Sequence, residues 1–338
     1  MPEHKVVVTR DVGTKATAIL EAQRYELVSW LEDGVAPRQW LLDNSPGASA
    51  LLVMGTDKVD EELLDSAGPS LKIVSTVSVG YDHIQTSALA QRKIRLGYTP
   101  EVLTDAVADI SVMLALMATR LGRESMQIVH DGKWPQAPWA PFLLCGQQLS
   151  SPDYVVGFVG FGRIAQATLT RLVAFGVSRC LFTTSTRKVP DEAYPGLQNK
   201  LGLKEFRSVT LDEIARESDL IIVLTPGGPS TYHLVDETFL RKMKKTSVLV
   251  NTARGSVVDS NALALALRGG WIWGAGIDVV EGEPDIDADH ILVKEPRAVV
   301  LPHIGSATYD TRNAMTCTAA ENLVRGLKGE KLLAEVEL

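Results

Sequence analysis

The sequence predicts an α/β protein with two doubly wound, parallel-sheet domains. Short β-branched and apolar runs alternate with helical patterns along all 338 residues. One group of these runs precedes a glycine-rich turn, and a second group begins with the run that feeds into it. The chain is long enough for two cores, so each group is expected to form its own domain.

The smaller domain is expected to contain the first group of strands, at Val6–Thr9, Ala50–Met54, Ile73–Val77 and Ile94–Gly97. An apolar helix over Asp105–Arg120 leads into the second domain. Its strands are expected at Val155–Val159, Leu181–Thr184, Leu220–Leu224, Ser247–Asn251, Gly274–Asp278 and Ala298–Leu301.

A helix over Thr311–Lys328 is expected to pack back on the first domain. The predicted domains are therefore 1–104 with 309–338, and 105–308. Residues 136–141 and 191–204 are interpreted as loops, because Pro and Gly interrupt them.

The glycine-rich turn is Gly160-Phe161-Gly162-Arg163-Ile164-Ala165, between a predicted strand and an amphipathic helix. Gly160 permits a tight turn, Gly162 lets the backbone approach a pyrophosphate, and Ala165 lets helix and strand pack closely. The pattern predicts a Rossmann-type dinucleotide-binding domain. The alternative is an ordinary glycine-rich turn.

The predicted second strand of this domain indicates which dinucleotide binds. An acidic residue usually lies about twenty residues after the glycines, on the ribose hydroxyls. No acidic residue occurs between Gly157 and Pro190, and the strand is followed by Ser185, Thr186, Arg187 and Lys188. Hydroxyls and cations suit a 2′-phosphate, so NADP(H) is preferred and NAD(H) remains possible. A solvated basic loop is the alternative interpretation.

Composition excludes several classes of protein. The net charge of −7 argues against binding to nucleic acid or acidic membranes. Three separated cysteines indicate free thiols in a reducing compartment and no metal site. No signal peptide or membrane-spanning run is visible, so a cytoplasmic location is expected.

Three segments at predicted strand ends carry an Arg, an acid and a His: Arg254, Glu283 and His303. A protonated His can donate a proton to a carbonyl oxygen, and a neighbouring Glu favours and orients the imidazolium. A guanidinium can hold a carboxylate through paired hydrogen bonds. The set suits reduction of a keto acid. The alternatives are a structural His, an Arg that caps a helix, and Glu281 as the acid.

In order, these segments resemble the D-2-hydroxyacid dehydrogenase family over nearly the whole chain. The matching motifs are the glycine turn, Ala253-Arg254-Gly255, Glu283-Pro284 and Pro302-His303. The resemblance implies that Arg254 binds substrate, that Glu283 pairs with the acid–base His303, and that Asp278 lies near the nicotinamide. It also implies a flavodoxin-like substrate domain, in which the backbone N–H groups of Val79 and Gly80 bind a carboxylate.

Within the family, the sequence is most similar to glyoxylate/hydroxypyruvate reductases of the animal type. The motifs are Ser75–Gly80, Gly97–Asp105 and Trp139-x-Pro141 with Leu144-Cys145-Gly146. This implies NADPH-dependent reduction of glyoxylate and hydroxypyruvate to glycolate and D-glycerate. D-3-phosphoglycerate dehydrogenase or another 2-keto acid reductase is the alternative, and a nucleotide-sensing corepressor a more distant one. The sequence departs from those reductases at two places. The loop from Thr225 to Pro229 differs from the usual one, and Ser185 stands where those reductases often carry Arg.

The full set of expected site residues follows. Substrate-binding residues are Val79, Gly80, Arg254, His303, Ser306 and Trp139. Cofactor-binding residues are Thr104, Gly160, Phe161, Gly162, Arg163, Ile164, Ser185, Thr186, Arg187, Lys188, Thr225, Pro226, Thr252, Ala253, Asp278, His303 and Gly305.

A homodimer is also expected. Helix 105–120 has one apolar set at Val112, Leu116 and Thr119, and a second at Ile110, Met113, Leu114 and Met117. One set can pack on its own domain, which leaves the other for a partner subunit. The loop Trp134–Trp139 should protrude, and the resemblance implies that Trp139 reaches the neighbouring active site. Alternatively, both tryptophans cover their own core.

Overall fold

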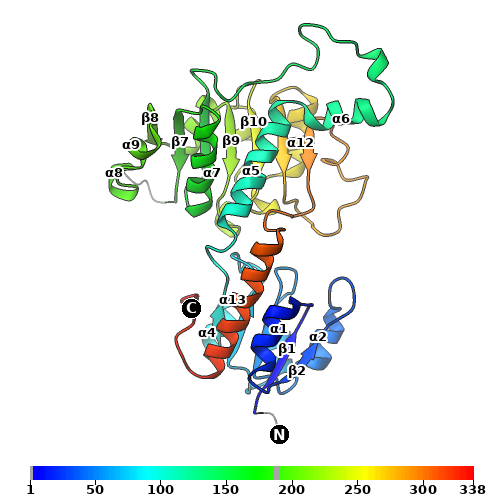
Figure 1. Cartoon of the computed structure of the whole chain (residues 1–338), viewed down its shortest axis with the longest axis vertical. Helices are drawn as coiled ribbons and strands as arrows, with labels where there is room; N and C mark the ends of the chain where they lie inside the picture. Colours follow the sequence, from blue (N-terminus) through cyan, green and yellow to red (C-terminus); the bar gives the residue numbers. More distant parts are fainter. Residues whose placement is uncertain (1–2, 186–189) are drawn as a thin grey trace. The chain divides into compact units, whose positions relative to one another are not determined.

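The computed structural model describes residues 3–185 and 190–338. The chain divides into two compact units. The first comprises Met1–Leu103 and Ala307–Leu338, and the second comprises Thr104–Ser306. Both chain termini belong to the first unit (Figure 1). The two parallel sheets of the predicted fold class are present, one in each unit.

The first unit has a five-stranded parallel sheet in the order β2-β1-β3-β4-β5. Its strands are β1 Lys5–Val8, β2 Glu26–Ser29, β3 Ala50–Val53, β4 Ile73–Thr76 and β5 Arg95–Gly97. Its helices are α1 Gly13–Glu21, α2 Arg38–Asn44, α3 Glu61–Ala67, α4 Thr86–Arg92 and α13 Tyr309–Leu327. Helix α13 packs on α1 and on β3, β4 and β5. Strand β2, absent from the prediction, is a partly exposed edge strand that pairs with β1 alone.

The second unit has a seven-stranded parallel sheet in the order β12-β11-β10-β9-β6-β7-β8. Its strands are β6 Val155–Val159, β7 Arg179–Thr183, β8 Glu205–Ser208, β9 Leu220–Val223, β10 Val248–Asn251, β11 Gly274–Ile277 and β12 Ala298–Val300. Its helices are α5 Thr104–Thr119, α6 Gly122–His130, α7 Arg163–Ala174, α8 Pro190–Ala193, α9 Leu197–Leu201, α10 Leu211–Glu217, α11 Glu237–Leu240 and α12 Ser260–Arg268. The strand order reverses at β6, between β7 and β9, which is where ligands bind in open α/β sheets.

Helix α5 packs on β10, β11 and α7 through small residues (Figure 1). A Cβ at Gly276 of β11 would lie 2.8 Å from the Cβ of Leu114, so glycine is what permits this close approach. Leu114 and Thr119 are fully buried, and Val112 is 6% exposed. Both predicted apolar sets therefore contain residues that are buried in their own unit, whereas Met113 of the second set is exposed.

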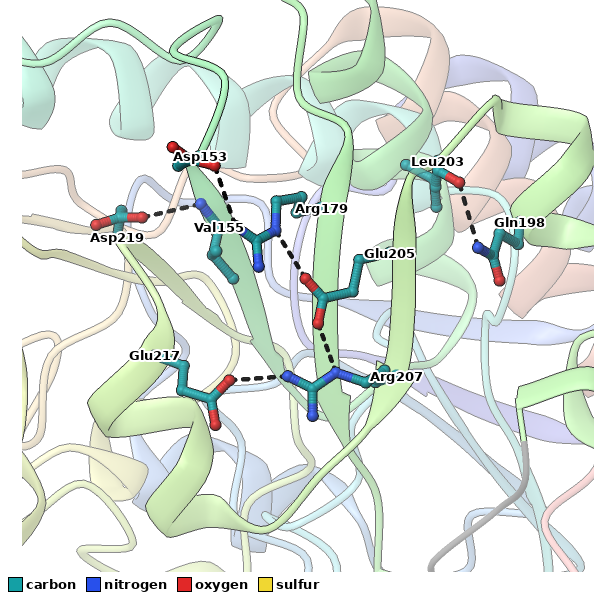
Figure 2. Close-up of polar contacts among 9 residues, drawn as sticks. All are labelled: Asp153, Val155, Arg179, Gln198, Leu203, Glu205, Arg207, Glu217 and Asp219. Carbon is teal, nitrogen blue, oxygen red and sulfur yellow. Dashed lines mark hydrogen bonds and ion pairs between the residues drawn. The ribbon is translucent and has the colours of Figure 1, made fainter.

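Strand β8 and the segment before it differ from the prediction. Residues 191–204 contain part of α8 and all of α9 rather than a continuous loop. Strand β8 was missed because its outward residues are charged. Figure 2 shows Glu205 between Arg179 of β7 and Arg207, which also contacts Glu217. Burial opposes ionisation of Glu205, but hydrogen bonds from Arg179 and Arg207 outweigh it and lower the pKa of its carboxyl.

The segment that begins with α6 extends away from the seven-stranded sheet and returns to the core at the buried Leu149 (Figure 1). Its base is fixed by the Arg123 guanidinium, which donates to backbone carbonyls of Val293, Glu295 and Ala298. Farther out, Trp134 is 66% exposed and Trp139 is 88% exposed. The protruding aromatic loop is thus present, and neither tryptophan covers the core of its own unit.

Candidate active site

The turn after β6 leaves backbone room for a phosphate group. Gly160 has φ +89°, and a Cβ there would lie 2.8 Å from the carbonyl oxygen of Leu224. Gly162 is the N-cap of α7, and no atom of the described residues lies within 4 Å of the position that a Cβ would take there. Ala165 is fully buried against the strand. The geometry fits a dinucleotide pyrophosphate at the helix N-terminus.

Phe161 lies in the middle of this turn, but its side chain points into the core. It packs against Phe158, Phe182, Phe206 and Tyr194, with ring centroids 4.6–5.5 Å away. The Tyr194 hydroxyl donates to the Phe161 carbonyl oxygen at 2.8 Å. Only the main chain of Phe161 is therefore presented to a cofactor, and Tyr194 fixes its conformation.

The ends of β10, β11 and β12 form a continuous backbone ladder at the carboxyl edge of the sheet. The N–H of Asp278 donates to the Asn251 carbonyl oxygen at 2.9 Å, and the N–H of His303 donates to that of Asp278 at 2.8 Å. Neighbouring strands thus deliver the loops that carry Arg254, Glu283 and His303 to one edge of the second unit.

Glu283 and His303 form a direct pair. His303 Nδ1 lies 2.7 Å from Glu283 Oε1, and the other carboxylate oxygen, Oε2, accepts the Val280 N–H at 3.1 Å. Glu281, the alternative acid, instead lies 2.8 Å from His233 Nε2. Of the two glutamates, only Glu283 is positioned to orient His303, whose side chain is 48% exposed.

Asp278 holds the turn that carries His303. One of its oxygens accepts the Ile304 N–H and the other accepts the Gly305 N–H, both at 2.8 Å. Burial raises the pKa of the Asp278 carboxyl, while the two N–H bonds favour its charged form. A Cβ at Gly305 would lie 2.9 Å from Asp278 Oδ2, so glycine is needed for this close contact.

Arg254 lies directly after β10, immediately before the 3₁₀ turn Gly255–Val257. Its carbonyl oxygen accepts from Asn251 Nδ2 at 2.9 Å, and its Nη1 donates to the Ala253 carbonyl oxygen at 2.8 Å. A Cβ at Gly227 would lie 2.9 Å from Arg254 Cγ, so the loop after β9 packs on its side chain. Arg254 does not act as a side-chain helix cap.

In the first unit, Val79 and Gly80 lie in the loop that follows β4. Ser78 Oγ donates to the Gly80 carbonyl oxygen at 2.7 Å and lies 2.7 Å from Thr76 Oγ1. Thr99 N–H donates to the Ser78 carbonyl oxygen at 2.9 Å. These bonds fix a half-buried loop at the carboxyl end of its own sheet.

The remaining expected residues fall in several places. Thr104 begins α5, and Ser306 ends the turn after His303. Thr252 Oγ1 lies 2.8 Å from Ser111 Oγ, and Ala253 N–H donates to Asn251 Oδ1 at 3.1 Å. Three further residues are exposed, namely Arg163, Ser185 and Pro226. Ile164 and Thr225 are half-buried. The expectations for Thr186, Arg187 and Lys188 lie outside the described residues.

Two features of this edge were not expected from the sequence. Tyr194 comes from a segment interpreted as loop, and no local pattern links it to the glycine turn. His233 follows the loop Thr225–Pro229, whose sequence departs from the family pattern. That departure was the one available signal that this loop has its own contacts.

Two further searches cover residues 3–185 and 190–338. No helix there is long and apolar enough to cross a membrane. Within the same residues, no cluster of three or more His, Cys, Asp or Glu side chains could hold a metal ion.

The chain is similar to known proteins over its whole length. Residues 112–305 match the family model described as D-isomer specific 2-hydroxyacid dehydrogenase, NAD binding domain. A mouse (Mus musculus) glyoxylate reductase/hydroxypyruvate reductase is 41% identical, covering 99% of this chain and 98% of that protein. A glyoxylate reductase of Thermofilum pendens is also 41% identical, covering 98% and 93%.

Solved structures show the same fold. A protein of Thermus thermophilus has a TM-score of 0.86 and 36% identity, covering 98% of this chain and 100% of that one. An NADPH-dependent glyoxylate/hydroxypyruvate reductase of Sinorhizobium meliloti, in complex with NADP and malonate, has a TM-score of 0.80 and 32% identity. That match covers 98% of this chain and 96% of the other.

Proposed function

The chain belongs to the D-isomer specific 2-hydroxyacid dehydrogenase family and is an oxidoreductase with a nicotinamide cofactor; from this premise we propose that it reduces glyoxylate and hydroxypyruvate with NADPH. The products are glycolate and D-glycerate. The observation that carries the proposal is the pair of Glu283 and His303 at 2.7 Å, on the sheet edge that also presents Arg254. Relatives named as glyoxylate reductases, matched over nearly the full length, support this substrate class.

The roles of the residues follow from the charge that develops during reduction. A nicotinamide held at the glycine turn would supply the hydride for the carbonyl carbon, and negative charge would then build on the carbonyl oxygen. His303 Nε2, the nitrogen not engaged by Glu283, donates the proton that neutralises this oxygen. Glu283 holds the ring orientation through its hydrogen bond to Nδ1.

Substrate binding is assigned to Arg254 and to the loop after β4. The Arg254 guanidinium can hold the substrate carboxylate and keto oxygen through paired hydrogen bonds. The backbone N–H groups of Val79 and Gly80 bind the carboxylate. Ser306, next to the turn that Asp278 organises, completes the proposed substrate set.

The preference for NADPH rests on charge. No acidic residue occurs between Gly157 and Pro190, whereas Arg187 and Lys188 follow the second strand of the cofactor domain. A carboxylate at the ribose would repel a 2′-phosphate, and cations attract it. Ser185, which is exposed after β7, adds a hydroxyl in the same stretch of the sequence.

We also propose a homodimer, formed through the exposed segment from α6 to Phe142, which is called the arm below. The arm exposes Met126, Val129, Trp134, Trp139 and Phe142, each more than half accessible. Large exposed apolar side chains in one segment favour burial at an interface. In the dimer Trp139 would narrow the neighbouring substrate pocket.

One coupled assay tests the function. The purified protein is given NADPH or NADH with glyoxylate, hydroxypyruvate, pyruvate or 3-phosphohydroxypyruvate, and cofactor oxidation is followed by absorbance. We expect the highest kcat/KM for NADPH with glyoxylate or hydroxypyruvate. A higher value with 3-phosphohydroxypyruvate, or no oxidation with any of them, would overturn the proposal.

A further inference from the structure

A second histidine–carboxylate cluster lies in the same unit as Arg254 and Glu283. The His233 side chain is 28% exposed and lies between two carboxylates. Its Nε2 is 2.8 Å from Glu281 Oε2, and its Nδ1 is 3.7 Å from Asp259 Oδ2. The Tyr232 ring stacks on the imidazole, with centroids 4.0 Å apart and planes 15° apart, and Tyr232 also hydrogen-bonds to Glu281.

Glu281 belongs to the short turn that presents Glu283. The Glu283 N–H donates to the Val280 carbonyl oxygen at 3.2 Å, and the Val280 N–H donates to Glu283 Oε2 at 3.1 Å. Glu281 therefore lies between the two residues whose mutual bonds set the direction of the Glu283 carboxylate. A side chain that anchors Glu281 restrains this turn.

The backbone of His233 is tied to the other loop, the one that follows Arg254. Its N–H donates to the Ser256 carbonyl oxygen at 2.8 Å, and the next bond of this pairing runs from Val235 N–H to the Val257 carbonyl oxygen at 3.0 Å. Asp259, the other carboxylate beside the ring, caps α12 by accepting from Asn261 and Ala262. His233 is thus fixed to the Arg254 side by its backbone and to the Glu283 side by its imidazole.

The two loops also touch directly at Gly255, so any relative movement is transmitted. A Cβ there would lie 2.1 Å from the carbonyl carbon of Val280. The His233 ring lies between the carboxylates of Asp259 and Glu281, and its Nε2 is within hydrogen-bond distance of Glu281.

We propose that His233 is a positioning residue. It holds the loop that carries Arg254 and the loop that carries Glu283 in a fixed relative position, because it joins Glu281 to the segment after β10. It acts through these loops and not on the substrate. The kinetic part of this inference rests on the proposed function. A displacement of Arg254 relative to Glu283 lowers the reaction rate only if both residues act on one keto acid. A small misplacement of such groups slows the chemical step more than it weakens binding.

The kinetic test compares His233→Ala and His233→Gln in the full-length protein. Gln can place an amide N–H close to the position of Nε2, whereas Ala cannot. We expect His233→Ala to lower kcat about tenfold or more with little change in the Kd for NADPH, and His233→Gln to recover most of the loss. The matched control is His290→Ala, since His290 accepts the N–H of Leu292 within its own turn. Equal loss in both His233 variants would overturn the proposal.

A second measurement does not depend on turnover. Hydrogen–deuterium exchange is followed in the peptides over residues 253–257 and 279–283. We expect His233→Ala to speed exchange in both peptides, with His233→Gln and His290→Ala close to the unmodified protein. Unchanged exchange in both peptides would overturn the proposal. An unmodified enzyme inactive on keto acids would overturn the proposed function but leave this measurement valid.

Discussion

The imidazole Nδ1 of His303 lies 2.7 Å from Oε1 of Glu283, which leaves Nε2 as the nitrogen directed away from the carboxylate. The second oxygen of Glu283 is held by the Val280 N–H. The carboxylate therefore has one fixed direction, and Nε2 of the ring is held in one orientation.

Replacement of His303 by Ala should lower kcat for keto-acid reduction by about 10²–10⁴-fold, the usual contribution of general acid catalysis. Glu283→Gln should cause a smaller loss, because the Gln amide oxygen can still accept from Nδ1 of His303 and keep the ring in place, while the carboxylate charge beside the ring is removed. Steady-state kinetics measure both effects, and fluorescence titration should show NADPH binding unchanged. Wild-type kcat/KM in His303→Ala would remove the residue from the mechanism.

Asp278→Asn should disturb the turn that carries His303. Both carboxylate oxygens accept backbone N–H groups, so an amide NH₂ must face one of these donors. An unpaired buried donor costs about 1–3 kcal/mol, and we expect a lower Tm together with a lower kcat. Asp285→Asn, at an exposed position of the chain after β11, is the control and should change neither. An unaltered Tm in Asp278→Asn would contradict the assigned role.

Removal of both Arg187 and Lys188 should erase much of the preference for NADPH. Each cation that pairs with a 2′-phosphate contributes about 1.5–3 kcal/mol. The ratio of kcat/KM for NADPH to that for NADH is the measurement, and Lys200→Ala, on α9, serves as a control for the loss of a surface cation. A ratio below one in the unmodified protein would contradict the preference itself.

Asp60→Asn should destabilise the first unit in a pH-dependent way. Burial opposes ionisation of Asp60, but hydrogen bonds from Lys58, Arg38 and the Leu63 N–H lower its pKa from 3.8 to about 2. The charged form is therefore stabilised by folding. This contribution is fully present above the unfolded pKa and is lost as pH falls from about 4 toward 2.

At neutral pH the expected loss in Asp60→Asn is about 1–2 kcal/mol, after allowance for solvent screening. Asn still caps α3, so the variant isolates the charge. Thermal unfolding at a series of pH values is the measurement, and the gap in Tm to the unmodified protein should narrow below about pH 4. A gap that is constant with pH would show that the charge of Asp60 is not responsible.

Trp139→Ala should relax selectivity toward bulkier 2-keto acids without dissociating the proposed dimer. The side chain is 88% exposed within its own subunit, so its proposed role requires a partner. Light scattering gives the assembly, and kcat/KM for a series of keto acids gives the selectivity. Trp134→Ala, in the same arm, is the matched control. A monomeric unmodified protein at assay concentration would refute the pocket role.

Two neighbouring glutamates show most clearly what the structure adds to the sequence. Glu281 and Glu283 are two residues apart and have the same chemistry, and the sequence left both open as the acid. The turn from Val280 to Glu283 directs their side chains to different histidines. Which histidine each one meets depends on loops that follow three different strands.

What the sequence by itself determined is local in origin. The run Val155–Val159, the glycine turn and the following helix could be predicted because a short apolar run, turn geometry and helical period act over a few residues. The buried strands of both sheets were found within one or two residues for the same reason.

What only the tertiary structure decided depends on residues distant in the chain. Edge strands β2 and β8 carry exposed or charged residues, which local hydrophobic pattern does not distinguish from loop. The inward direction of Phe161, the Tyr194 hydroxyl bond to its carbonyl and the bridge through His233 each join segments that meet only after the sheet has formed. Side-chain partners are chosen by packing across strands, and no short-range pattern records that choice.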